Sequence, residues 1–310
     1  MSRVLITGSN GFIGSHLVRH FCEQDKIVFA IDRPTTYSII PNPKKYTYFP
    51  LDLPDPVLIE KLSEWKPDVI IHTAGNSSVP NSVINPLGDF SGSAVVYFNL
   101  LDAVRKSCPE TKVINFSSAA VYGNPENLPI DENEITHPIS PYGFHKLICE
   151  NISKEFYLLY KLNICSVRIF SAYGPGLRRQ VIWDILNKVI YDPEIQLAGT
   201  GKESRDFIFV DDIANAIDVL ILRGAFTSEA YNVASGQDTS IEDLSKLVIT
   251  SLGVKKDIVF SGQLRLGDPL HWRADIHKMQ SLGFTPRISM IEGISQFTSW
   301  AINELNQNTR

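Results

Sequence analysis

Two periodicities of apolar and polar residues alternate along this chain. Short apolar runs bounded by turn residues predict buried strands at residues 3–7, 27–31, 46–49, 69–72, 112–118 and 165–170. Between these runs, apolar residues recur at the spacing of one buried helix face. Strands that alternate with helices predict the α/β fold class, with a doubly wound parallel sheet covered by helices on both faces.

The alternation stops near residue 171, where proline and glycine become frequent. We expect a smaller second domain from there, and at 310 residues the chain is long enough for both domains. Patterns at 211–222 and 231–234 lead back to the sheet, so the boundary is expected to be discontinuous. The larger domain is predicted at residues 1–170 plus about 206–238, the smaller at about 171–205 plus 239–302, and a polar tail at 303–310.

Tyr142 and Lys146 stand four residues apart in a segment, 141–160, whose pattern predicts one helix. Pro141 suits the first helical position, and apolar residues follow at helical spacing. Residues four apart share a helix face, so the phenol and the ammonium can contact one ligand. A lysine beside a tyrosine favours the phenolate, which can act as a base. The same spacing also occurs by chance on ordinary amphipathic helices.

A glycine-rich turn follows the first predicted strand. Gly8, Gly11 and Gly14 stand between that strand and a helical pattern. Strand, glycine turn and helix in this order favour a phosphate-binding turn, where backbone N–H groups at a helix N-terminus meet a pyrophosphate. A plain turn between strand and helix is the alternative.

The second predicted strand leads directly into Asp32. An acidic residue at this place accepts hydrogen bonds from an adenosine ribose and repels a 2′-phosphate, which favours NAD as the cofactor. Arg33 follows directly and is suited to a 2′-phosphate, so NADP stays the alternative.

The glycine turn, the Tyr142–Lys146 pair and Ser118 upstream of it together resemble the extended short-chain dehydrogenase/reductase family, in its NAD-dependent nucleotide-sugar epimerase and dehydratase branch. The resemblance implies a Rossmann-type sheet with a smaller C-terminal substrate-binding domain. It extends over most of the chain, through residues 52–53, 70–75, 115–123, 168–176, 205–212, 265–268 and 274–286.

The resemblance also implies roles for individual residues. Catalysis would fall to Ser118, Tyr142 and Lys146. Cofactor binding would fall to Gly8, Asn10, Gly11, Phe12, Ile13, Gly14, Asp32, Arg33, Asp52, Leu53, Thr73, Ala74, Gly75, Tyr142, Lys146 and Phe170. Substrate binding would fall to Ser77, Ser118, Ala119, Tyr142, Ser171, Leu197, Arg205, Arg265 and Asp268.

The implied substrate is a nucleotide-diphosphate sugar. Tyr142 takes a hydroxyl proton as hydride leaves the same carbon, Ser118 donates to the developing carbonyl oxygen, and Lys146 supports both phenolate and nicotinamide ribose. We expect an epimerase acting at C4, in which hydride returns to the other face of a transient 4-keto sugar. A reductase that uses NAD(P)H on a nucleotide-linked 4-keto-6-deoxysugar is the alternative. A catalytically silent NAD(H)-binding regulator or scaffold is the second alternative.

Some positions depart from the family pattern. Ala119 and Ala120 stand where sugar 4,6-dehydratases of this family carry an Asp-Glu pair. Methyl groups cannot transfer protons, which argues against dehydration. Ser171 replaces an Asn that commonly contacts the diphosphate, and the family's Asn-x-x-Gly-Thr is missing around Ser93. These changes leave the sugar and the nucleotide open.

Composition narrows the partners and the cellular setting. The net charge is −5 with Lys and Arg dispersed, which argues against a nucleic-acid partner. No apolar run reaches the length of a membrane span, and the first strand begins at residue 3, so we expect no membrane anchor and no signal peptide. The four cysteines lack a paired spacing, which favours reduced thiols and a cytoplasmic location.

Two shorter patterns are weak. His16 and His20 share a helix face at metal-ligand spacing, but Leu17 stands where a zinc protease carries its glutamate, so no metal is expected. Residues 199–202 read Gly-Thr-Gly-Lys, but Glu203 stands where a phosphate-binding loop requires Ser or Thr.

Two predicted helices carry apolar faces, formed by Leu100, Leu101 and Val104 on one helix and by Ile148, Ile152 and Phe156 on the other. In the family that the chain resembles, such helices pack across a dimer axis as a four-helix bundle. We therefore expect a homodimer, and burial of both faces within one chain is the alternative.

Overall fold

The computed structural model describes residues 2–34, 45–263 and 269–308. At its centre is a seven-stranded sheet in the order β10-β6-β5-β4-β1-β2-β3, in which all neighbours are parallel. Its strands are β1 (Arg3–Thr7), β2 (Ile27–Asp32), β3 (Tyr46–Pro50), β4 (Val69–His72), β5 (Lys112–Ser118), β6 (Asn163–Ile169) and β10 (Thr227–Val233). The Rossmann-type sheet predicted from the sequence is confirmed, because the apolar runs fall on its central strands.

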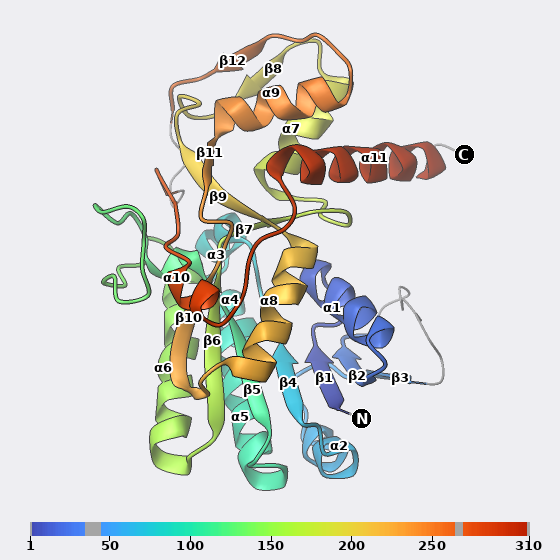
Figure 1. The fold of residues 1–310 in the computed structure, drawn as a ribbon, viewed down its shortest axis with the longest axis vertical. Helices are drawn as coiled ribbons and strands as arrows, with labels where there is room; N and C mark the ends of the chain where they lie inside the picture. Colours follow the sequence, from blue (N-terminus) through green and yellow to red (C-terminus); the bar gives the residue numbers. More distant parts are fainter. Residues whose placement is uncertain (1, 35–44, 264–268, 309–310) are drawn as a thin grey trace.

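Helices cover both faces of this sheet (Figure 1). One face carries α1 (Phe12–Glu23) and α8 (Val210–Arg223), and the other carries α2 (Val57–Trp65), α5 (Val96–Ser107) and α6 (Pro141–Tyr160). Strand residues alternate between the two cores: Val4 and Ile6 pack with α1, whereas Leu5 packs with α2 and α5. Such strands are buried on both sides, which explains their continuous apolar runs.

Short helical elements follow β4 and β5. Between β4 and α5 run α3 (Val79–Ile84), α4 (Pro86–Phe90) and a π-helical turn, η1 (Ser91–Val95). The 3₁₀ turn η2 (Ala119–Val121) follows β5 directly. All of them lie near the carboxyl edge of the sheet, where parallel strands end together.

A smaller region sits above this edge in Figure 1. Its elements are β7 (Ser171–Tyr173), α7 (Gln180–Tyr191), β8 (Ile195–Leu197), β9 (Ser204–Phe209), β11 (Asp238–Ser240), α9 (Ile241–Ser251), β12 (Ile258–Phe260) and α11 (Met290–Asn308). The short helix α10 (His277–Ser281) lies lower in Figure 1, beside β10, and its Met279 packs in the core of the sheet. β9 pairs with β7 and β11, and β8 pairs with β12. α7, α9 and α11 share a separate apolar core, which supports the second domain predicted here; the domain limits themselves stay a prediction.

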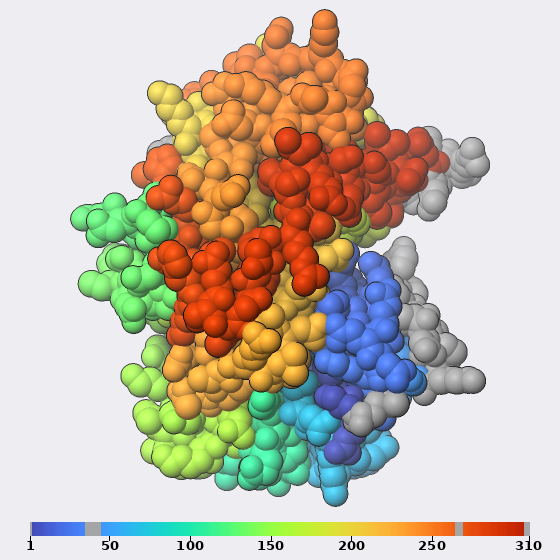
Figure 2. Space-filling view, viewed as in Figure 1, coloured from blue at the N-terminus to red at the C-terminus, as the bar shows by residue number. Residues whose placement is uncertain are grey.

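Distant parts of the chain meet on the visible surface of the molecule. Figure 2 shows the blue N-terminal helix beside the orange and red C-terminal segments. α1 and α8 contribute to one core, although they are far apart in sequence. No helix in the described residues is both long enough and apolar enough to cross a bilayer.

The apolar faces predicted to meet in a dimer are mostly buried inside the protomer, which corrects that part of the prediction. Leu100, Leu101, Val104 and Phe156 lie in the core beneath α5 and α6, and Ile152 packs against it. A helix that covers a sheet must turn its apolar stripe inward, and these residues form that stripe. Of the six, Ile148 is the one that stays exposed.

Candidate active site

A cleft of about 980 Å³ opens at the carboxyl edge of the sheet. The glycine turn after β1, the ends of β5 and β6, and the first turns of α6 form one side. The loop before α7, α7 itself and β9 form the other. The strand order reverses between β1 and β4, and such a reversal point is where doubly wound sheets bind their ligands.

The cleft brings together the three predicted catalytic residues, Ser118, Tyr142 and Lys146. Predicted ligand-binding residues that also line it are Gly8, Asn10, Gly11, Phe12, Ile13, Gly14, Thr73, Gly75, Ser77, Phe170, Ser171, Leu197 and Arg205. Six others lie outside its lining, namely Asp32, Arg33, Asp52, Leu53, Ala74 and Ala119. Arg265 and Asp268 are not among the described residues.

The glycine turn is too tight for a side chain at its helical end. A Cβ at Gly14 would lie 2.1 Å from the carbonyl oxygen of Gly8. Because this oxygen belongs to the backbone, it cannot turn aside as the end of a side chain can. This contact brings the N-terminus of α1 close to the end of β1, so the first N–H groups of the helix face the cleft. Such a terminus suits a pyrophosphate.

Asp32 lies beside this turn, at the end of β2. Its Oδ2 accepts a hydrogen bond from the Asn10 backbone N–H at 2.8 Å, and its Oδ1 accepts one from the Arg33 N–H at 2.7 Å. Tyr48 supports the same corner, because its hydroxyl accepts from Asn10 Nδ2 and donates to the Arg33 carbonyl. Sequence reasoning missed Tyr48, since nothing in β3 indicates that its hydroxyl reaches the turn.

The first turn of α6 approaches η2 closely enough to face Ser118. Ser140 caps the helix by accepting from the Gly143 N–H at 3.2 Å. A Cβ at Gly143 would lie 2.5 Å from the Ala120 carbonyl oxygen, so only glycine permits this approach. Ser118 ends β5, and its Oγ accepts from the Ala120 N–H at 3.2 Å. Tyr142 and Ser118 therefore line one wall of the cleft from two elements.

Lys146 lies one turn further along α6. Its Nζ donates to the Phe116 carbonyl at 2.7 Å and lies 5.8 Å from the centre of the Tyr142 ring. The Tyr142 backbone N–H donates to Ser82 Oγ at 3.1 Å, which ties the helix start to α3. The ammonium is thus held between β5 and the ring of Tyr142.

Two buried hydroxyls flank the cleft without a hydrogen-bond partner in the part of the chain that the structure describes. Ser9 Oγ belongs to the glycine turn, and Ser93 Oγ belongs to the π-helical turn η1. A Cβ at Gly75 would lie 3.7 Å from Ser93 Oγ and 3.9 Å from Lys146 Nζ. Buried hydroxyls are normally hydrogen-bonded, so both fit a ligand rich in phosphate and ribose groups. The residues present therefore suit a dinucleotide.

Residues that the sequence reasoning missed lie on the far wall of the cleft. Arg179 donates to Ser77 Oγ at 2.5 Å and so bridges the two sides. Arg178 pairs with Glu304 of α11. Trp183 of α7 also lines the cleft. The only signal in the sequence was a pair of adjacent arginines after a Pro-Gly loop, because the partners are far away in the chain.

The Gly-Thr-Gly-Lys segment has no room for a phosphate. The carboxylate of Glu203 accepts from the Thr200 N–H at 3.0 Å and from the Gly201 N–H at 3.0 Å. The backbone donors that would hold an anion thus bind a side chain of the same loop.

His72 ends β4 beneath the cleft and is buried. Its Nδ1 lies 2.7 Å from Thr7 Oγ1, and its ring stacks on Tyr97 with centroids 5.1 Å apart. Burial, together with the charge of Lys146, lowers the pKa of His72 to about 3. The imidazole therefore stays neutral in the folded protein at pH 5.

We expect the free energy of unfolding to fall by about 2 kcal/mol from pH 7 to pH 5 because of His72. The unfolded imidazole has a pKa near 6.5 and binds a proton in this range, whereas the folded one does not. Stability that is present above pH 6.5 is therefore lost as the pH falls. Urea unfolding at both pH values measures the loss, with His72→Asn as the reference that cannot titrate. Equal pH responses of the two proteins would contradict a buried neutral imidazole.

Known proteins resemble this chain over most of its length. The model of the NAD dependent epimerase/dehydratase family matches residues 4–234. A putative UDP-glucose 4-epimerase of Methanocaldococcus jannaschii is 32% identical over 304 residues, covering 97% of this chain and 98% of that relative.

Solved structures with the same fold include two epimerase complexes. The UDP-N-acetylglucosamine 4-epimerase from Methanobrevibacter ruminantium M1, in complex with UDP-N-acetylmuramic acid, superimposes with a TM-score of 0.89 at 30% identity, covering 98% of this chain and 99% of that one. The UDP-glucose 4-epimerase of Thermus thermophilus, in complex with NAD, gives a TM-score of 0.87 at 26% identity, covering 96% and 98%. The chain therefore belongs to the NAD-dependent epimerase/dehydratase family.

Proposed function

We propose that this protein is an NAD-dependent nucleotide-sugar epimerase that inverts one hydroxyl-bearing carbon, C4 in the first instance. The observation that carries the proposal is the cleft in which Ser118, Tyr142 and Lys146 converge beside the glycine turn. The relatives and solved structures named above, which are called 4-epimerases, support the same activity.

The cofactor would lie along the carboxyl edge of the sheet. The N-terminus of α1 would hold its pyrophosphate, Asp32 the adenosine ribose, and Lys146 the nicotinamide ribose. When bound, NAD supplies the hydride acceptor for the first half of the reaction and the donor for the second half. Asp32 already has its carboxylate beside the turn, which favours NAD over NADP.

Three side chains would support the reaction, and one of them would transfer the proton. Tyr142 takes the proton from the sugar hydroxyl as the hydride departs from the same carbon, and returns it after the sugar has turned over. Ser118 donates a hydrogen bond to the oxygen as it becomes a carbonyl. Lys146 holds its positive charge 5.8 Å from the Tyr142 ring.

The far wall would bind the nucleotide diphosphate. Arg205 lines the cleft. Its guanidinium lies 5.8 Å from the centre of the Trp272 ring, and this contact orients the side chain. Arg179 lines the cleft beside Ser77 and adds a second cation. Remote binding energy of this kind would position the reacting sugar.

Dehydration is disfavoured by the two residues after Ser118. Ala119 and Ala120 are both buried, and neither carries a group that can move a proton. The site thus offers acid–base groups for one sugar carbon, as an epimerase requires.

The test is mass spectrometry of small molecules released by denaturing the purified protein, followed by incubation with UDP-, dTDP- and GDP-sugars. Released NAD, together with interconversion of a sugar pair and no net absorbance change of the cofactor, would support the epimerase. Stoichiometric consumption of NAD(P)H with 4-keto sugars would replace it by a reductase. Bound NAD without any turnover would leave a regulator or scaffold.

We also propose a homodimer in which α5 and α6 of two protomers form a four-helix bundle. These helices are neighbours, because Phe98 contacts Phe156 with ring centroids 5.3 Å apart. Their outer surfaces expose Phe98 (42%), Phe144 (52%), Ile148 (36%) and Leu159 (67%). Exposed apolar side chains gathered on two adjacent helices are typical of an interface.

Ile148→Glu is expected to convert the dimer into a monomer, because the carboxylate would be buried without a partner. Light scattering after size-exclusion chromatography measures the mass. Leu222→Glu is the matched control, since Leu222 is 78% exposed on α8, away from α5 and α6. A monomeric wild-type protein, or an Ile148→Glu dimer, would refute this arrangement.

A cytoplasmic location is part of the same proposal. Cys22, Cys149 and Cys165 are buried free thiols, as is usual in reducing compartments. Cell fractionation checks it, and recovery outside the cytoplasm would contradict it.

A further inference from the structure

A buried ion pair anchors the catalytic face of α6. Tyr142, Lys146 and Glu150 follow one another at four-residue spacing, so they form one stripe along the helix. The Glu150 carboxylate accepts from Arg168 Nε at 3.0 Å and from Arg168 Nη2 at 2.8 Å. It also accepts from Ser117 Oγ at 2.6 Å. One carboxylate thus links α6 to β5 and β6.

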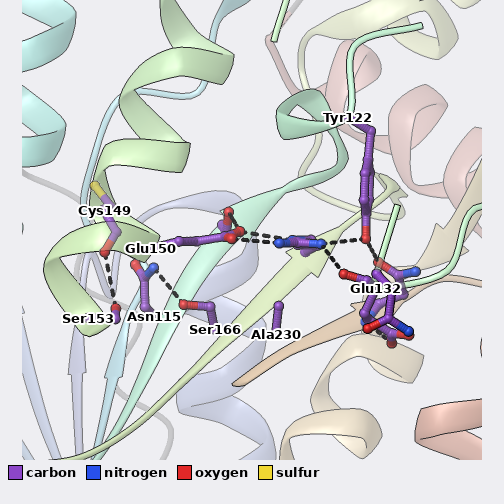
Figure 3. A network of polar contacts seen from close by, with 12 residues as sticks. Asn115, Tyr122, Glu132, Cys149, Glu150, Ser153, Ser166 and Ala230 are labelled. Atoms are coloured by element: carbon purple, nitrogen blue, oxygen red, sulfur yellow. Dashed lines mark hydrogen bonds and ion pairs between the residues drawn. The ribbon is translucent and has the colours of Figure 1, made fainter. Parts of the chain in front are cut away.

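The guanidinium is fixed from its other side as well (Figure 3). Arg168 Nη1 donates to the Tyr122 hydroxyl at 2.8 Å and to the Glu132 carbonyl at 3.1 Å. The Tyr122 hydroxyl donates in turn to Asn232 Oδ1 at 2.7 Å, and Asn232 belongs to β10. The network therefore spans three strands, and Arg168 has little freedom to rotate.

Arg168 is charged although it is buried. Burial tends to lower the pKa of Arg168, but the hydrogen bonds and charge of Glu150 outweigh it, and the pKa is raised overall. Arg168 is 7% exposed, so the pair lost most of its hydration on folding. A buried pair of this kind adds little net stability compared with apolar residues of the same size. We therefore look for a role of the Glu150–Arg168 pair other than stabilising the fold.

Glu150 and Arg168 contact the sheet beside the predicted catalytic residues. Ser117 stands between Phe116, whose carbonyl accepts from Lys146, and Ser118. Glu150 lies one helical turn from Lys146 and two turns from Tyr142. If α6 rotated or slid along its axis, the ammonium and the phenol would move with it.

We propose that Glu150 and Arg168 are a positioning pair, which fixes α6 on β5 and β6 so that Lys146 and Tyr142 face Ser118. As a statement about catalysis it rests on the proposed epimerase function. Neither residue touches the reacting atoms; both act through the helix.

Glu150→Gln keeps the shape of the side chain and removes its charge. We expect kcat to fall about 100-fold, the effect of a misplacement of about 1 Å, while the KM for the nucleotide sugar and the amount of bound NAD stay within about twofold. The double variant Glu150→Gln/Arg168→Met leaves no lone buried charge. It is expected to recover the melting temperature of the wild type but not its kcat.

A second ion pair serves as the control. Asp218 of α8 contacts His20 at 2.5 Å and Lys26 at 3.4 Å, and does not line the cleft. Asp218→Asn should lower stability and leave kcat within about twofold of the wild type. If kcat of the double variant returned with its melting temperature, or if Glu150→Gln kept the wild-type kcat, the pair would be merely structural and the proposal would fail.

A crystal structure of Glu150→Gln provides a readout that does not depend on turnover. The 2.7 Å contact between Lys146 Nζ and the Phe116 carbonyl should be lost. An unchanged contact would overturn the positioning role. If the wild type converted no sugar, the proposed function would fall, and this structural comparison would still decide the inference.

Discussion

Replacing Tyr142 by phenylalanine is expected to lower kcat about 1,000-fold, within the range that one general acid–base group contributes. The variant keeps the ring, which lines the cleft and lies 5.8 Å from Lys146 Nζ, but loses the atom that accepts the sugar proton. Substrate and NAD contacts elsewhere in the cleft remain. We therefore expect the KM and the amount of bound NAD to change by about twofold at most. Initial rates with the converted sugar nucleotide measure the effect.

Tyr157→Phe is the matched control, because Tyr157 lies on the same helix and does not line the cleft. It should keep the wild-type rate. A Tyr142→Phe variant that retained more than about a tenth of the wild-type kcat would show that another group moves the proton.

Gly14→Ala is expected to abolish NAD binding at micromolar concentrations and to lower the free energy of unfolding by about 3 kcal/mol. The added methyl group would lie 2.1 Å from the Gly8 carbonyl oxygen, so α1 must move away from β1. This movement would remove the backbone donors from the pyrophosphate. Fluorescence titration with NAD and urea unfolding measure the two effects.

Gly11→Ala provides the comparison within the same turn. Its Cβ would lie 3.1 Å from the same oxygen, and Gly11 has a φ of −68°, which any residue adopts. A small shift can accommodate it, so a milder loss is expected. Normal NAD binding by Gly14→Ala would show that the close approach of α1 does not matter for the cofactor.

The sheet could be predicted because its strands are buried on both faces. The apolar runs of β1 and β4 are typical of such strands, and β5 carries the buried polar Asn115 within its run. α6 was predicted with its observed bounds, because Pro141 marks its start and the apolar spacing continues to Tyr160. Ser118 and Phe170, at the ends of β5 and β6, line one cleft because parallel strands end at one edge, whereas Asp32 at the end of β2 does not line it.

Other features depend on contacts between distant segments. Arg179 meets Ser77 across 102 residues, and Arg168 meets Tyr122 across 46. No periodicity or local motif encodes such pairs. Most residues predicted for the dimer faces, all except Ile148, were wrong for a related reason: an apolar stripe in the sequence does not say whether it faces the sheet or a second protomer. Leu100 faces the sheet, whereas Phe98 is exposed.

The hydrogen bond from the Asn10 N–H to Asp32 has a consequence for cofactor engineering. Arg33 follows Asp32 directly and carries a charge suited to a 2′-phosphate, so removing the acidic charge of Asp32 is the obvious route to an enzyme that accepts NADP. The same carboxylate, however, anchors the backbone of the glycine turn. A substitution of Asp32 that allows NADP to bind would therefore loosen the glycine turn and weaken the binding of either dinucleotide. The choice between NAD and NADP and the affinity for both are thus coupled through one side chain. A successful switch would need a second change that restores an acceptor for Asn10.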